Sequence, residues 1–489
     1  MLLNSDLKEN TASNKAAHIV ALIPRGEVIR NFEHSGVFEQ ISWSTNLSLL
    51  SISANPEIDN LLKDKYKNVI ALREYEDSWI VRFQRELLDV AHGRWLWSRA
   101  AQERWRLRDS EAKTAKQKAV RFAKKTISLP LANKAGLRIL GTSERASSRL
   151  LNRTSEFIDL YKKLKPSLVF NGSHIHSRNA IQAVEAAQWL GIPTATFIFS
   201  WDNLTSQGRI TLPYNYFLVW NESIKRDLLE MYKWVRTENV FVTGTPQFDF
   251  HFRPEFYLSC ADFCEQIGAD PQRPIVFYAT GMANHMPGEP EIVEAIADML
   301  AGMDVPIKPQ LLVRIYPKDL TGRFDEMKKR RTDVLFPEIA WDPSWLTPKF
   351  EDSFALVNTL RHCALGINVA STISLELCMF DKPVINVGFN PDSVPEEVLS
   401  YADYYEFDHY KPVVESGAVR VARSPSEMKE LIEISLKNPA ERSSERKVII
   451  DKIFGTTLDG NSSKRVADVL LMLAADQTRV PNTSDSKFD

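Results

Sequence analysis

The segment from Leu365 to Asn390 constrains the fold more than any other part of the chain. Its apolar run from Leu365 to Val369 predicts a buried strand, and Val384 to Val387 predicts a second one. Helix-forming residues lie between these strands, and the sequence Asp-Lys-Pro before Val384 ends the helix. A strand, a helix and a second strand in so short a span form the unit from which parallel sheets covered by helices are built.

The turn that opens this helix is rich in hydroxyl side chains. Ser371, Thr372 and Ser374 lie where hydroxyls cap backbone N–H groups at a helix start. Such a start attracts anions, because its N–H groups and the helix dipole both favour negative charge. Glu376 follows within two turns, where a carboxylate can accept hydrogen bonds from a ribose diol. The segment therefore predicts a nucleotide site, with an ordinary capped helix between two strands as the alternative.

The alternation of strand and helix runs through most of the chain and indicates parallel sheets. The 489 residues suffice for two domains or more, at roughly 150 residues each. We predict a first domain over 17–244 and a second over 245–475, with a loose arm at 1–16 and a disordered tail at 476–489. Helices are expected between the strands, two of them at 28–39 and 254–267. Further strands are expected at 18–24, 48–53, 69–72, 167–171, 193–199, 216–220, 240–243, 274–280, 310–315, 333–336 and 419–422.

Residues 77–150 interrupt this alternation and predict a helical insertion in the first domain. Within it, 103–125 hold nine basic and three acidic side chains, and Trp95, Trp97 and Trp105 lie beside or within that range. One interpretation is a solvated helical hairpin. The other is a surface over 95–125 that docks on an anionic membrane or a polyanionic acceptor. Nucleic acid is not expected as a partner, because no nucleic-acid module is present and the net charge is only -2.

Several classes of protein are disfavoured by what the sequence lacks. No apolar run reaches the roughly 18 to 20 residues of a membrane span, and the N-terminal residues lack the apolar core of a signal peptide. The four cysteines form no CxxC pair, so we expect the protein in the reducing cytoplasm. We also expect that it could attach peripherally to the inner face of the membrane. No GxGxxG, GxxxxGK[ST], GxSxG or Asp-x-Asp motif occurs, so neither a cofactor nor a metal is expected.

Two loops of the first domain carry unusual chemistry. His174, His176 and Arg178 follow the predicted strand at 167–171, and Ser-Trp-Asp-Asn at 200–203 follows the strand at 193–199. Loops at the carboxyl ends of parallel strands gather at one edge of the sheet, where ligands bind. An indole stacks on sugar rings, and carboxylates and amides bind sugar hydroxyls. The alternative is a capped loop in which Asp202 and Asn203 satisfy their own backbone.

The Ser/Thr-rich turn, the Glu five residues after Ser371 and the following Lys-Pro-Val-Ile strand resemble the donor half of GT-B glycosyltransferases. They are similar also to UDP-sugar 2-epimerases and to polyol-phosphate transferases of wall and capsule synthesis. The Ser-Trp-Asp-Asn loop resembles one in glycosyltransferases of capsule and O-antigen synthesis. The resemblance implies that Glu376 binds the ribose and that Ser371, Thr372 and Ser374 contact the diphosphate.

Other segments extend the resemblance. Val-Thr-Gly-Thr-Pro at 242–246 is similar to the hinge between GT-B domains, with Thr245 where Asn is common. Gly281 follows the first strand of the second domain, in a loop that approaches the diphosphate in the GT-B pattern. Arg-Ile-Tyr-Pro-Lys at 314–318 resembles an Arg-x-His-Pro segment, but Tyr316 replaces the His and leaves its acid role in doubt. Arg314 and Lys318 still supply positive charge for a diphosphate.

We therefore expect an α/β chain of two Rossmann-like domains facing across a cleft, with a helical insertion in the first. The expected function is metal-independent transfer of a sugar from a nucleotide-sugar donor to a surface-polysaccharide or lipid-linked glycan. The alternatives are a CDP-glycerol-type polyol-phosphate transferase, a UDP-sugar 2-epimerase and an inactive glycan-binding scaffold. The predicted catalytic residues are Asp202, His174 and His176, the donor residues are Gly281, Arg314, Lys318, Ser371, Thr372, Ser374 and Glu376, and the acceptor residues are Trp201, Asn203 and Arg178.

Overall fold

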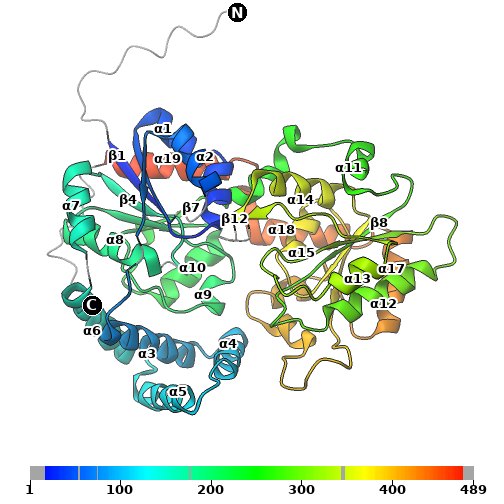
Figure 1. Cartoon of the computed structure of the whole chain (residues 1–489), viewed down its shortest axis with the longest axis horizontal. Coiled ribbons are helices and arrows are strands. Elements are labelled where there is room, and N and C mark those ends of the chain that lie inside the picture. The colour runs from blue at the N-terminus through cyan, green and yellow to red at the C-terminus, as the bar shows by residue number, and fades with distance from the viewer. Residues whose placement is uncertain are drawn as a thin grey trace, which may run out of the picture.

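The computed structural model describes residues 17–52, 56–73, 75–152, 154–175, 178–342 and 347–476. The predicted arm at 1–16 and nearly all of the predicted tail lie outside these residues. Two α/β halves lie side by side, each with a parallel sheet between helices (Figure 1). The expected fold class is confirmed.

Within the described residues the first sheet has seven parallel strands in the order β3-β2-β1-β4-β5-β6-β7. In β1, His18 lies opposite Asn46 on one side and Ile19 lies opposite Leu168 on the other. The central strands are buried on both faces, which is why they read as continuous apolar runs in the sequence. The strands are β1 His18–Ile23, β2 Asn46–Ser51, β3 Asn68–Ala71, β4 Leu168–Asn171, β5 Thr194–Phe197, β6 Tyr216–Val219 and β7 Val240–Val242.

The second sheet has six parallel strands among the described residues, in the order β10-β9-β8-β13-β14-β15. The strand order reverses beside β1 in the first sheet and beside β8 in the second, so each sheet has a switch point at which ligands bind. The strands are β8 Ile275–Ala279, β9 Gln310–Arg314, β10 Val334–Leu335, β13 Leu365–Asn368, β14 Val384–Val387 and β15 Arg420–Ala422, and β11 Trp341–Asp342 pairs antiparallel with β12 Thr347–Pro348.

Helices cover both faces of each sheet (Figure 1). In the first half they are α1 Val37–Ser44, α2 Pro56–Lys65, α7 Ser155–Leu164, α8 Arg178–Trp189, α9 Asn203–Ser206 and α10 Glu222–Met231. In the second half they are α11 Cys260–Ile267, α12 Glu289–Ala301, α13 Asp325–Arg330, α14 Phe350–His362, α15 Ile373–Met379, α16 Lys411–Glu415, α17 Pro425–Lys437 and α18 Ser443–Phe454.

Two predicted helices differ from the structure. The helix expected at 28–39 is a π-helical segment, Ile29–His34, followed by α1, because Gly36 adopts the left-handed conformation at φ 88° and separates them. The helix expected at 254–267 begins only at Cys260, where the Ser259 side chain accepts the N–H of Asp262. Pro254 opens a short 3-10 turn instead.

The last helix, α19 Ser462–Ala475, was predicted to belong to the second domain but packs on the first. In Figure 1 it lies beside α1 and β1. Its apolar face, which includes Val466 and Leu470, is buried in this position. Asp249, in the 3-10 segment Pro246–Phe252 that links the halves, accepts hydrogen bonds from the backbone N–H groups of Ser462 and Ser463 at 3.0 and 2.6 Å. The predicted limit of 245–475 for the second domain is therefore corrected at its C-terminal end.

The predicted insertion consists of α3 Trp79–Leu96, α4 Arg99–Ser110, α5 Ala115–Ser128 and α6 Lys134–Leu151. These helices form a separate unit below the first sheet in Figure 1. They enclose a small core of their own, formed by Leu87, Leu88, Ala91, Leu137 and Leu140. At its tip, Arg106 of α4 donates to the carbonyl oxygen of Glu397 at 2.6 Å, so the insertion also contacts the second half.

Candidate active site

A cavity of about 710 Å³ lies between the two halves, at the carboxyl ends of strands from both sheets. Loops after β1 and β5 line it from the first half, and loops after β8, β9 and β13 line it from the second. This is the position that doubly wound sheets give to ligands. Its polar and charged lining residues are Arg25, Glu27, Arg30, Asn179, Ser200, Asn203, Gln247, Thr280, Arg314, Tyr316, Lys318, Asp352, Ser371, Thr372 and Glu376.

Positive charge is concentrated in this cavity. Arg314, at the end of β9, donates from Nη2 to both carboxylate oxygens of Asp352, at 2.8 and 2.9 Å. Arg30 donates to Gln247 Oε1 at 2.6 Å, and burial lowers the pKa of its guanidinium. Burial also lowers the pKa of Lys318, which is paired with Glu27. With Arg25, four cations line this partly desolvated cavity, and such a set suits a ligand that carries several negative charges.

Glu376 lies on α15, and its buried side chain also lines the cavity. One carboxylate oxygen, Oε2, is 2.8 Å from Nε2 of His251, which comes from the segment linking the two halves. Within the described part of the chain, no hydrogen bond engages Oε1. The carboxylate is therefore held in one orientation and keeps an oxygen for a ligand, as the ribose prediction requires.

The hydroxyls around α15 divide into two groups. Ser371 and Thr372 line the cavity, and Ser371 Oγ accepts the N–H of Ile373 at 3.3 Å. Ser374 is buried, and its Oγ bonds Asn368 Oδ1 at 3.0 Å and Tyr410 Oη at 2.7 Å. The structure therefore does not bring Ser374 to the cavity, because the helical turn directs this side chain back toward the sheet.

Gly281 also lies outside the cavity lining, although its neighbours Thr280 and Met282 belong to it. Its N–H donates to the carboxylate of Glu289, with distances of 3.0 and 2.9 Å to the two oxygens. A Cβ at this position would meet the sulfur of Met286 at 2.2 Å. Close packing accounts for the glycine, and contact with a diphosphate stays a prediction.

The predicted acceptor loop after β5 reaches the second half. Trp201 donates from Nε1 to Thr372 Oγ1 at 3.2 Å, and its ring lies 5.2 Å from that of His409. Both oxygens of Asp202 accept hydroxyl hydrogen bonds, from Ser200 and Ser206, at 2.5 Å each. These contacts explain a carboxylate among hydroxyls without a ligand. Trp201 and Asp202 do not line the cavity, whereas Ser200 and Asn203 do.

The loop after β4 is described only in part. His174 bonds the carbonyl oxygen of Phe197 through Nδ1 at 3.2 Å and is not among the cavity-lining residues. His176 and the side chain of Arg178 lie outside the described residues. The catalytic roles of Asp202, His174 and His176 and the acceptor role of Arg178 stay predictions.

Comparison with known proteins identifies the architecture. No protein-family model matches the sequence, and no curated protein matches it either. The UDP-GlcNAc 2-epimerase of Neisseria meningitidis, solved with UDP-GlcNAc, is 12% identical and aligns over 93% of this chain and 100% of that chain, with a TM-score of 0.52. The UDP-GlcNAc 2-epimerase of Methanocaldococcus jannaschii is 14% identical over 93% of this chain and 99% of that chain, with a TM-score of 0.51. A glycosyltransferase from Rickettsia africae is 11% identical over 94% of this chain and 99% of that chain, also at 0.51.

The chain has the GT-B fold.

Within this GT-B fold, the loop that follows β1 also lines the cleft, although none of its residues was predicted from the sequence. Arg25 and Glu27 line the cleft, and Arg25 packs its guanidinium 4.8 Å from the ring centre of Phe199. Arg30 follows one turn later. The loops after β4 and β5 were predicted because ligands bind at the carboxyl ends of parallel strands. The same rule applies to the loop after β1, because β1 lies beside the switch point of the first sheet.

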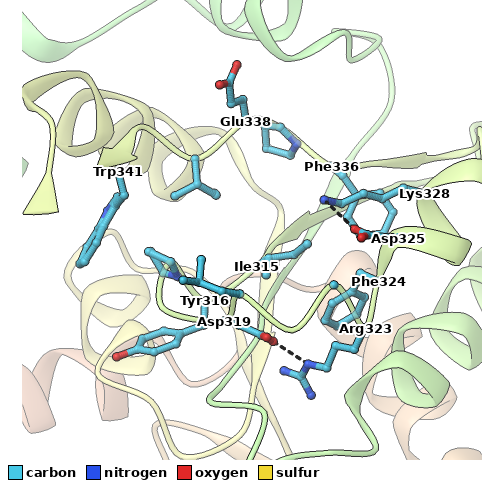
Figure 2. A pocket seen from close by; sticks show the side chains of 15 residues that line it. Ile315, Tyr316, Asp319, Arg323, Phe324, Asp325, Lys328, Phe336, Glu338 and Trp341 are labelled. Atoms are coloured by element: carbon cyan, nitrogen blue, oxygen red, sulfur yellow. Dashed lines mark hydrogen bonds and ion pairs between the residues drawn. The ribbon is translucent and has the colours of Figure 1, made fainter. Parts of the chain in front are cut away.

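A second cavity of about 510 Å³ adjoins the GT-B cleft in the second half (Figure 2). Ile315, Tyr316, Pro317 and Trp341 line both cavities. Figure 2 shows Trp341 and Phe336 on opposite sides of the cavity, with the Arg323–Asp319 ion pair of 2.6 Å at its edge. Aromatic rings beside polar groups provide additional contact area for a bulky ligand.

The insertion pairs most of the basic residues at 103–125 with its own carboxylates. Six of the nine basic side chains at 103–125 are ion-paired within the insertion: Arg104 and Arg108 with Asp89, Arg106 with Glu103, Arg121 and Lys125 with Asp109, and Lys124 with Glu86. Trp105 lies between cations, with Lys125 4.9 Å and Arg94 5.1 Å from its ring centre. Lys113, Lys116 and Lys118 are exposed, and none has an ion pair in the described part of the chain. In that part, no helix combines the length and hydropathy needed to cross a bilayer.

Proposed function

We propose that this protein is a glycosyltransferase that moves a sugar from a nucleotide-sugar donor to a surface-polysaccharide or lipid-linked glycan acceptor. The observation that carries the proposal is the cleft itself. It places Glu376 and the hydroxyls of Ser371 and Thr372 in one cavity with Arg30, Arg314 and Lys318. A carboxylate for a ribose and cations for a diphosphate are the two requirements of nucleotide recognition.

The donor is assigned to the second half. Arg314 and Lys318 offset the charge that develops on the leaving diphosphate, a role that fixed cations perform well in a partly desolvated site. The backbone start of α15, with Ser371, lies beside them in the same cavity. We assign this stabilisation to the cations of the chain itself, in accord with the expectation that no metal and no cofactor are needed.

A second candidate function is epimerisation at C2 of a UDP-sugar, because two of the similar structures are UDP-GlcNAc 2-epimerases. Such an enzyme needs several acid–base groups around one sugar. The described cavity has three carboxylates, on Glu27, Asp352 and Glu376, and each has an ionisable partner. A transferase, which needs one base and a stabilised leaving group, fits this arrangement better.

A thermal-shift screen across UDP-, GDP-, CDP- and CMP-linked donors tests the proposal. We expect one class of nucleotide sugar to raise the melting temperature, because a ligand that binds only the folded state stabilises it. A transferase then releases the nucleotide only with an acceptor, whereas an epimerase inverts C2 without one. A preference for CDP-glycerol would support the polyol-phosphate alternative, and no response to any donor would support the scaffold alternative.

The insertion is proposed to bind an anionic membrane through its unpaired lysines. Replacing Lys113, Lys116 and Lys118 with glutamine should reduce sedimentation with anionic vesicles, because each basic side chain near such a surface contributes about 1 kcal/mol. The melting temperature should hardly change, since these side chains are exposed. Replacing the exposed Lys429, Lys447 and Lys452 of α17 and α18 changes the net charge equally and is the control. Equal sedimentation of both triple variants, or none by the parent protein, would contradict the proposal.

A further inference from the structure

Glu27 occupies an unusual position in the cleft. It follows β1, lines the cavity and is only 7% exposed. Arg25 binds both of its oxygens, with Nε donating to Oε2 at 2.8 Å. Lys318, which comes from the second half, binds Oε1 across the cleft. A carboxylate is thus held at the boundary between the halves by one cation from each.

The three carboxylates of the described cavity have different partners. Asp352 holds Arg314 and accepts the Nε1–H of Trp341 at 2.8 Å, and Glu376 holds His251. Both belong to the second half, to which the donor is assigned. Glu27 is the cavity-lining carboxylate that the first half contributes within the described residues. With the donor assigned to the second half, we assign the acceptor to the first, which puts Glu27 on the side where an acceptor hydroxyl must be deprotonated.

We propose that Glu27 is the catalytic base of the transfer and that the donor diphosphate releases it by taking Lys318 as its own partner. This inference rests on the proposed function. Asp202 is a weaker candidate because its side chain does not line the cavity. Its partners Ser200 and Ser206 belong to its own loop, so a bound donor does not withdraw them, whereas it can withdraw Lys318 from Glu27.

The reaction balances as a direct displacement. The acceptor hydroxyl gives its proton to the Glu27 carboxylate while its oxygen forms a bond to the anomeric carbon. The bond between that carbon and the phosphate oxygen breaks, and its electron pair leaves with the nucleoside diphosphate. Lys318 and Arg314 lie where they can offset the resulting negative charge.

The electrostatics of the cleft support this order of events. Burial raises the pKa of Glu27, but the charges and hydrogen bonds of Arg25 and Lys318 outweigh it and lower the pKa to about 2. A carboxylate so strongly stabilised as an anion is a poor base. Transfer of Lys318 to the diphosphate removes one of the two stabilising cations, so the basicity of Glu27 rises only when the donor is bound.

The test compares Glu27→Gln and Glu27→Ala with Glu57→Gln. Glu57 of α2 pairs with Lys349 at 3.1 Å, also across the two halves, but both side chains are exposed and outside the cavity. With the donor found in the screen, both Glu27 variants should lower turnover by about 10²–10⁴-fold, the usual contribution of a general base. Glu57→Gln should turn over normally. Formate should restore part of the turnover of Glu27→Ala, since a small carboxylate can enter the space left by the side chain.

Nucleotide affinity provides a readout that a purely structural role would not produce. Both Glu27 variants should bind the nucleoside diphosphate as tightly as the parent or more tightly, because Lys318 no longer has a competing partner. Three outcomes would overturn the role of Glu27. Glu27→Gln could turn over normally, Asp202→Asn could lose turnover where Glu27→Gln does not, or formate could fail to rescue folded Glu27→Ala. Absence of nucleotide binding by the parent protein would instead contradict the proposed function, and with it this inference.

Discussion

Replacing Glu376 with alanine is expected to weaken nucleotide binding by about 1–3 kcal/mol, or roughly 5- to 150-fold in Kd. The variant removes a buried carboxylate that lines the cleft and is oriented by His251 at 2.8 Å. Its loss eliminates the charged acceptor proposed for the ribose hydroxyls. Isothermal titration with the nucleoside diphosphate measures the effect.

Two further variants separate the ribose contact from the local structure. Glu376→Gln keeps an acceptor for His251 but removes the charge, so it should fold like the parent and still bind nucleotide less tightly. Glu351→Ala removes an exposed carboxylate of α14 that does not line the cavity, and should leave the affinity unchanged. Parent-like affinity in folded Glu376→Ala would exclude Glu376 from the site.

Asp249→Ala should lower the free energy of unfolding by about 2–4 kcal/mol. The side chain is buried and accepts the N–H groups of Ser462 and Ser463 together with the Ser463 hydroxyl, the last at 2.5 Å. Alanine would leave these donors buried without an acceptor at the start of α19. The helix α19, which follows the second half in the chain and packs on the first, would lose this anchor.

Urea unfolding followed by tryptophan fluorescence measures this loss, and limited proteolysis should show earlier cleavage before α19. Asp451→Ala, at an exposed position of α18, is the matched control and should change the unfolding midpoint little. Identical unfolding and cleavage of Asp249→Ala and the parent would show that packing alone holds α19 in place.

The strands and the general position of the site could be predicted from the sequence for a simple physical reason. Parallel strands buried on both faces must be apolar throughout, so β1, β4 and β8 appear as short apolar runs. Ligands bind where such strands end, so a site is expected in the loops after them. Glu376, Arg314 and Lys318 indeed line one cavity.

Details within a helical turn were harder to predict. Ser371 and Ser374 are both hydroxyls near the start of α15, yet only Ser371 reaches the cavity. Which of them faces a ligand depends on the rotation of the helix against β13 and β14, where Asn368 and Asn386 bond Ser374. Spacing along the chain specifies neither that rotation nor those partners.

Contacts between distant segments depended on the tertiary structure alone. Glu27 and Lys318 are 291 positions apart, and their ion pair exists only because the two sheets face each other. The basic residues of the insertion suggested a positive surface, but folding α3, α4 and α5 together neutralises five of those at 103–125, and Arg106 pairs with Glu103 within α4. Composition determines how much charge a segment carries. The distances that pair these charges arise only when the helices and the two halves pack together.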